Sequence, residues 1–252
     1  MRMRSATRLL IGALFLTLLA SCGGGDSPVV NSTWNLKSAY LTLSPYQNST
    51  PITYLFNVTG AVGSDQISGT GSLVVAPHIS GTFESGTASQ QVAALEADYT
   101  VTGGGPTVIV LSSTISSWYS LNNGPFGETH QACSTGCSNG LLPVEYIVYG
   151  TSSSNNNLPT SASSGATGTL YTGQRYSNAT KATSLGTIIA TYSVTAANAG
   201  AAYFDITIIE KDTNANQVSK RVMHYYLDPS DAISLKGLSL TDSTKDINFV
   251  FR

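Results

Sequence analysis

Charged residues are scarce in this chain of 252 residues: Asp, Glu, Lys and Arg together make up only 10% of it. An average soluble domain has about 25%. This shortage disfavours a charged helical protein and favours an extracytoplasmic β-sheet protein. Disorder is also disfavoured, because 41% of the residues are hydrophobic and supply enough apolar surface for a packed core.

Basic residues are scarcer than acidic ones once a leader is removed. Arg2, Arg4 and Arg8 lie in the first residues, so nine basic residues remain against 14 acidic ones, a net charge of about −5. No basic cluster follows, and nucleic acid is therefore not an expected partner. We expect no cofactor, because no phosphate-binding glycine loop leads into a helix.

The chain has no hydrophobic run long enough to cross a bilayer. Its longest run, residues 9–20, has about 12 residues, whereas a spanning helix needs about 20. This run follows the three arginines and precedes small residues, which is the three-part layout of an export signal. Residues 1–21 are therefore predicted to be a cleaved signal peptide.

Residues 19–22, Leu-Ala-Ser-Cys, resemble the lipobox of bacterial lipoproteins. The resemblance implies that Cys22 receives a diacylglycerol and becomes the new N-terminus, with palmitate as a typical acyl group. Two or more acyl chains anchor a protein stably. Gly23 stands where an aspartate retains lipoproteins of enteric bacteria in the inner membrane, so the resemblance implies the outer membrane. We expect the periplasmic face, with exposure at the cell surface as the open alternative. Residues 22–33 are predicted to form a flexible tether.

The body of the chain lacks a sustained helical period and fixed-length repeats, and alternation with a period of two dominates instead. We predict an all-β fold, an antiparallel meander that forms a curved half-open barrel or a two-sheet sandwich, with few or no helices. Residues 34–150 are predicted to form a first β lobe and 170–252 a second, separated by a Ser/Asn-rich loop at 151–169. Predicted strands are 52–58, 67–75, 91–101, 107–120, 144–149, 186–196, 201–211, 217–228, 233–240 and 246–252; the Ala-rich segment near Leu95 leaves a short helix as the alternative.

Cys133 and Cys137 are the only cysteines besides the anchor. In an oxidising compartment a disulfide that closes this Ser/Gly loop is the favoured interpretation. The alternatives are free thiols or a zinc site in which both thiolates and His130 supply three ligands. We favour no metal site, because a fourth ligand is not evident, although Glu128 is nearby.

Reaction signatures are missing from the sequence. There is no G-x-S-x-G nucleophile elbow, and His224 alternates with Val222 and Tyr226, which places it on a sheet face. Glu145 and Asp205 could pair as glycosidase carboxylates, but isolated acids on strands are usually solvated and point outward. The adjacent aromatic residues at 118–119 and 225–226 point to opposite faces, so core packing is favoured over a sugar-binding platform.

The chain as a whole resembles proteobacterial lipoproteins that combine a lipobox, a glycine-rich tether and an all-β body. We expect an outer-membrane-anchored, non-enzymatic binding or structural module of the cell envelope, attached to the membrane through Cys22. One alternative is a carrier of lipid or another apolar ligand in a half-open barrel. The other is a cell-envelope hydrolase, which a histidine clustered with an acid and a hydroxyl would support. Partners expected besides the membrane are an apolar ligand or an envelope protein.

Overall fold

A computed structural model describes residues 33–43, 50–102, 107–120, 124–134, 142–150, 157–243 and 247–252. The predicted signal peptide, the lipidation site Cys22 and almost all of the tether lie outside these residues. Cys137 and the side chain of Cys133 lie outside them as well, so the disulfide stays a prediction. Within the described residues, no helix is long and apolar enough to cross a membrane.

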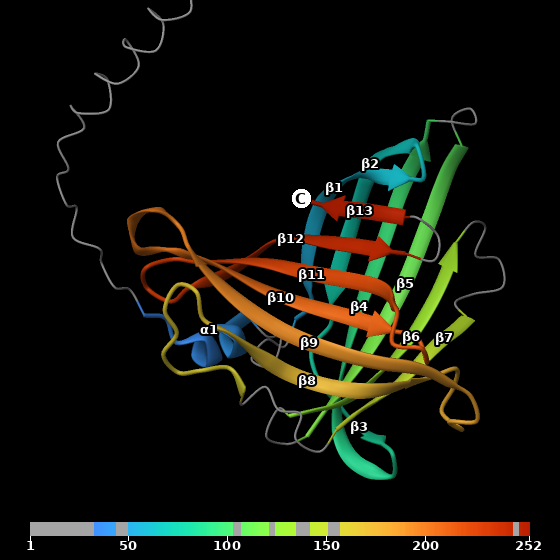
Figure 1. Cartoon of the computed structure of the whole chain (residues 1–252), viewed down its shortest axis with the longest axis horizontal. Helices are drawn as coiled ribbons and strands as arrows, with labels where there is room; N and C mark the ends of the chain where they lie inside the picture. Colours follow the sequence, from blue (N-terminus) through green and yellow to red (C-terminus); the bar gives the residue numbers. More distant parts are fainter. Residues whose placement is uncertain are drawn as a thin grey trace, which may run out of the picture. The chain divides into compact units, whose positions relative to one another are not determined.

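Antiparallel strands form nearly the whole described part of the chain, and the predicted all-β meander is confirmed (Figure 1). The strands run in chain order around one sheet, and each pairs with the next, except that β2 pairs with β4 instead of β3. Their bounds are β1 Ile52–Val62, β2 Asp65–Val75, β3 Ile79–Phe83, β4 Gly86–Val101, β5 Thr107–Tyr119, β6 Pro125–Ser134, β7 Leu142–Tyr149, β8 Thr167–Tyr176, β9 Ser184–Ala196, β10 Ala202–Lys211, β11 Gln217–Leu227, β12 Ile233–Asp242 and β13 Ile247–Phe251.

The sheet closes into a barrel because β2 pairs with β1 on one side and with β4 on the other. β1 also pairs with β13, which completes a circuit of 12 strands and leaves β3 as an extra strand beside β4. Gly69 makes this closure possible, since a Cβ there would lie 2.0 Å from the Asp98 carbonyl oxygen. The sequence predicted a half-open barrel or a two-sheet sandwich. The chain forms a barrel, and this barrel is closed.

The two predicted β lobes supply neighbouring strands of this one sheet. β7, from residues 34–150, pairs with β8, and β13, from residues 170–252, pairs with β1. Residues Ser32–Arg252 accordingly form one compact unit. The end of the predicted Ser/Asn-rich loop also packs inward, because Leu158 and Ala162 are buried and Ala162 bridges to Trp34.

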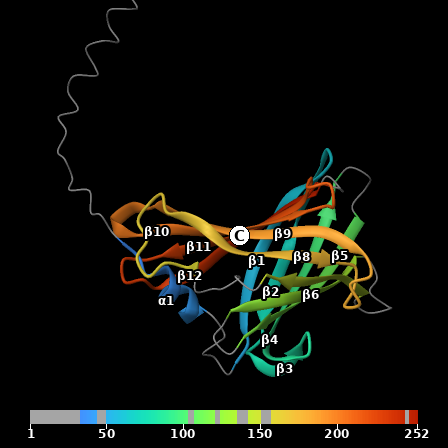
Figure 2. The ribbon, with the colours of Figure 1, turned by 60° about the horizontal axis from the view of Figure 1, so that its bottom comes forward.

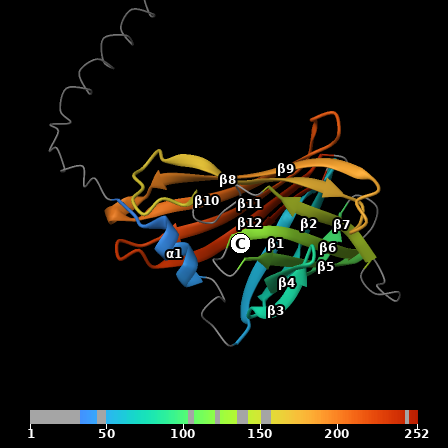
Figure 3. The same cartoon turned by 90° about the horizontal axis from the view of Figure 1, so that it is seen from below.

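The α-helix of the described residues, α1 (Leu36–Leu43), lies at one end of the barrel, beside the ends of β10 and β12 (Figure 3), and a single 3-10 turn, η2 (Asn198–Gly200), precedes β10. Asn35 caps α1: its side-chain oxygen accepts a hydrogen bond of 2.9 Å from the Ser38 amide. Leu36 is fully buried, and the Tyr40 ring meets the Phe204 and Tyr225 rings at 6.5 and 6.2 Å. The helix therefore fills the lumen at this end with apolar side chains.

The hairpin of β3 and β4 folds over the outside of the barrel (Figure 2). Phe83 stacks on Trp118 of β5 at 5.7 Å and on Tyr146 of β7 at 5.3 Å. Gly127 of β6 makes room for it, because a Cβ there would lie 2.4 Å from the Phe83 ring. This cover explains why β7 is buried on both faces from Glu145 onward.

Two apolar clusters fill the interior on either side of the lumen. The larger surrounds Phe204 and includes Trp34, Leu36, Ile147, Leu170, Ile188, Val194, Ile206 and Leu227. The smaller contains Phe56, Val58, Ile67, Tyr99, Phe249 and Phe251. Both come from the inward positions of alternating strands.

Candidate functional site

Six ionisable side chains meet inside the barrel, at inward positions of five strands. Glu128 and His130 come from β6, Glu145 from β7, Arg175 from β8, Glu210 from β10 and Arg221 from β11. We call these six residues the lumen cluster. Their side chains are between 5% and 15% exposed, so they are charged groups removed from bulk water, which is rare unless they are paired.

The lumen cluster joins strands that stand almost opposite each other in the barrel. Arg221 lies 3.3 Å from Glu210 on the neighbouring strand and 3.7 Å from Glu128 across the lumen. Arg175 forms an ion pair with Glu145 and reaches Glu210 at 3.3 Å. Because β6 and β11 are five places apart in the circuit of strands, these contacts span the interior and occupy it at this level.

His130 lies between two carboxylates. Its Nε2 atom is 2.8 Å from Glu128 and its Nδ1 atom is 3.4 Å from Glu145. A neutral imidazole has one N–H donor, whereas the protonated ring has two, so the protonated form satisfies both neighbours. It also balances the charge of the cluster, since three carboxylates then face two guanidinium groups and one imidazolium.

The pKa values follow from these contacts. Burial lowers the pKa of His130, but the hydrogen bonds with Glu128 and Glu145 outweigh it and leave the pKa above its usual value. Burial raises the pKa of Glu128, and the hydrogen bond with His130 and the charge of Arg221 bring it down to about 2. Burial, followed by the nearby charge of Glu128, raises the pKa of Tyr149 well above its usual range. These shifts favour the negative charge on Glu128 and the positive charge on His130.

His130, Glu145 and Glu210 are the residues of the lumen cluster that could hold a metal ion, with one ligand atom each within 4.8 Å of the others. Imidazole and carboxylate ligands suit zinc and similar ions. However, Arg175 already binds both carboxylates, and Arg221 binds Glu210 from the other side. A divalent cation would have to displace these guanidinium groups. The three candidate ligands are therefore better suited to the ion pairs than to a metal ion.

The sequence named His130 and Glu128 together only in the zinc alternative at Cys133 and Cys137, whereas in the structure their side chains form an ion pair of 2.8 Å. One residue of the site was placed wrongly. Glu145 was expected to point outward into solvent, but this residue is 6% exposed and points into the lumen. Asp205 does lie on the outer face, with its side chain 35% exposed. The two acids are therefore on opposite sides of the barrel wall and cannot act as a glycosidase pair.

Arg175, Glu210 and Arg221 were not identified from the sequence. Glu210 does continue the inward series Ile206 and Ile208, and Arg221 the series of Tyr225 and Met223. A charged residue at the alternating positions that buried apolar residues occupy was therefore the sequence signal that could have identified these side chains as inward-pointing. The aromatic pairs behave as predicted, because Trp118 packs under Phe83 and Tyr225 is buried at 7% exposed, beside Phe204.

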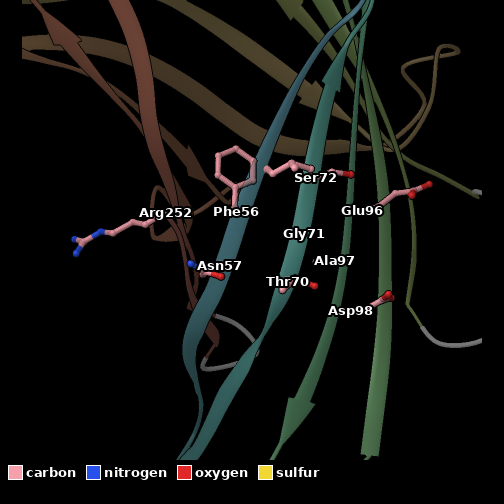
Figure 4. Close-up of a pocket in the computed structure, with 10 residues that line it drawn as sticks. Phe56, Asn57, Thr70, Gly71, Ser72, Glu96, Ala97, Asp98 and Arg252 are labelled. Carbon is pink, nitrogen blue, oxygen red and sulfur yellow. The ribbon is translucent and has the colours of Figure 1, made fainter.

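An open depression of about 550 Å³ lies on the outer surface of β1, β2 and β4 (Figure 4). Glu96 and Asp98 project into it from β4 and Thr70 from β2, whereas Arg252 extends away from the two acids. Leu55 beside them is 80% exposed. This surface is polar and acidic, with one prominent apolar side chain.

Comparison with known proteins gives no match to a family model, to a curated protein or to a solved structure.

Proposed function

We propose that the protein is a lipoprotein anchored to the outer membrane through lipidated Cys22, and that its barrel is a non-enzymatic binding or structural module of the cell envelope. The proposal has two supports. The lipobox-like residues 19–22 support the anchor, and the filled lumen supports a module that works through its outer surface on the periplasmic side.

The filling of the barrel is the observation that carries this proposal. A carrier of lipid would need an apolar cavity that encloses most of its ligand. Here α1 packs on Phe204 and Tyr225 at one end, and charged side chains cross the lumen farther along. Inserting an acyl chain would separate buried ion pairs, which costs about 3–5 kcal/mol for each pair broken. The interior therefore favours a scaffold over a carrier.

Native mass spectrometry of the detergent-solubilised protein tests the barrel's role. We expect the mass of the lipidated chain alone, with no second lipid or apolar molecule released on denaturation. A stoichiometric apolar ligand that is lost together with the fold would contradict the proposal and would favour the carrier. A chain with Cys22→Ser, purified in soluble form, serves as the control for lipid bound only through the anchor.

Labelling of cells with radioactive palmitate tests the anchor separately. We expect the wild-type chain to take up label and to sediment with outer membranes, and Cys22→Ser to do neither. The matched control is the double variant Cys133→Ser, Cys137→Ser, which keeps the lipobox and should be labelled like the wild type. Equal labelling of Cys22→Ser and wild type would refute the lipidation site.

A further inference from the structure

Three polar side chains form a hydrogen-bonded row on the outer face of the barrel. Asp205 of β10, His224 of β11 and Ser239 of β12 come from three consecutive strands. The Nδ1 atom of His224 lies 3.0 Å from the Asp205 carboxylate, and its Nε2 atom lies 2.9 Å from the Ser239 hydroxyl oxygen. The side chains of His224 and Asp205 are 36% and 35% exposed, so solutes can reach the row.

The strand register produces this row. Asp205 and His224 are direct partners across β10 and β11. On the other side His224 faces Gly237, and the register then shifts so that Lys236 has no partner. Ser239 is the direct partner of Val222 and therefore the diagonal neighbour of His224, two residues farther along β12. Diagonal neighbours on one face of a sheet lie within reach of a long side chain, so the imidazole meets the Ser239 hydroxyl.

The contacts fix the tautomer of the imidazole. The Asp205 carboxylate can only accept, so Nδ1 carries the proton and donates to it. Nε2 is then left as an acceptor for the Ser239 hydroxyl. A carboxylate that orients a histidine, which in turn accepts the proton of a serine, is the arrangement that activates a serine as a nucleophile.

We infer that Ser239 is a nucleophile that His224 activates, and that it takes the acyl group of an activated ester. The Ser239 oxygen forms a bond to the acyl carbon, and the bond between that carbon and the leaving oxygen breaks. The serine proton passes to Nε2 of His224 and then to the leaving oxygen. Asp205 stabilises the imidazolium between these two transfers. This activity does not rest on the proposed function; it adds a covalent mode of binding to the outer surface.

The surroundings of Ser239 set the expected rate. β12 pairs with β11 on one side and with β13 on the other, so the amide of Ser239 belongs to the sheet ladder and is not aimed at a developing oxyanion. The increase in the acylation rate of Ser239 then comes from general base assistance by His224, which is typically 10²–10⁴-fold. We accordingly expect reaction with reactive esters and fluorophosphonates rather than rapid cleavage of unactivated amides.

The test treats the detergent-solubilised full chain with p-nitrophenyl acetate and with a fluorophosphonate, and follows the intact mass and the labelled peptide. We expect one acyl or phosphonyl group per chain, on Ser239. Ser239→Ala should not be labelled. His224→Gln should react at least about 100-fold more slowly than the wild type. Ser239→Cys should restore acylation. Ser234→Ala, an outward serine of the same strand, is the matched control and should react like the wild type.

Each outcome decides one point. Label on another residue of the wild type, or equal rates for wild type and His224→Gln, would overturn the inference even if Ser239→Ala failed to fold. Release of one equivalent of nitrophenol per chain supports the inference and leaves the non-enzymatic proposal intact. Continuous release that Ser239→Ala abolishes supports the nucleophile but overturns the non-enzymatic proposal.

Discussion

Replacement of Arg221 with methionine tests the lumen cluster most directly. Methionine keeps much of the length of the side chain and removes the guanidinium group that lies 3.3 Å from Glu210 and 3.7 Å from Glu128. Both carboxylates are about 10% exposed, so neither can recover full hydration. We expect the variant to lose stability because it leaves two buried negative charges with fewer partners.

Two lines of reasoning give the size of this loss. Breaking a buried ion pair by removing one partner costs about 3–5 kcal/mol. The pKa of Glu128 falls from 4.5 to about 2, which corresponds to about 3 kcal/mol in all; His130 supplies more of this than Arg221, so the lower end of the range for a broken pair applies. A lowered pKa means that this stabilisation is present above pH 4.5 and is lost as the pH falls toward 2. At neutral pH we therefore expect Arg221→Met to lose about 3 kcal/mol.

Urea unfolding at neutral pH, followed by far-UV circular dichroism, measures this loss. Lys220→Met is the matched control, because Lys220 is the exposed neighbour on the same strand and should change the free energy of unfolding by no more than about 0.5 kcal/mol. In a double-mutant cycle, Glu128→Gln should recover at least about 1 kcal/mol in the Arg221→Met background. A loss below about 1 kcal/mol, or a cycle without coupling, would refute the account of the cluster.

Three further changes test other parts of the fold. His130 has a raised pKa, so its stabilisation is complete below about pH 6.5 and is lost as the pH rises through the higher native value; thermal melts of the wild type should therefore fall toward pH 9, and those of His130→Asn should fall less. Gly69→Ala places a Cβ 2.0 Å from a carbonyl oxygen of β4 and should cost about 2 kcal/mol or more in urea unfolding. Gly86→Ala, where the nearest atom is 3.5 Å away, is its control and should be nearly neutral. Phe83→Ala should cost about 3 kcal/mol and raise amide hydrogen exchange in the β3–β4 hairpin, whereas normal protection there would contradict the proposed packing.

Most strands were predictable because one face packs against the interior and the other contacts solvent. Residues 201–211 show this most clearly, since Phe204, Ile206 and Ile208 alternate with Asp205, Thr207 and Ile209, and the first series is buried. Closure of the barrel was not predictable in this way. It depends on β4 pairing with β2 beyond the interruption at 76–78, and alternation within a strand carries no information about its second neighbour.

The position of Glu145 was not predictable for a related reason. Apolar residues flank it on both sides, so the sequence does not show which face of β7 points inward. The outward face is covered by Phe83, which is more than 60 residues away in the chain. An acid on this strand therefore could not be assigned to solvent from local pattern alone, and its partners Arg175 and Glu210 come from strands formed later in the chain.

The lumen cluster and the row at Ser239 depend on the same register. In β10, Glu210 points inward and Asp205 outward, five residues apart; in β11, Arg221 points inward and His224 outward, three residues apart. A slip of one residue in either strand would exchange the two faces. It would carry buried charges to the surface and bring Asp205 or His224 into an apolar lumen. A slipped register would also separate the buried ion pairs, and a buried charge left without its partner costs about 3–5 kcal/mol. The inner charges therefore select the register that arranges the outer nucleophile.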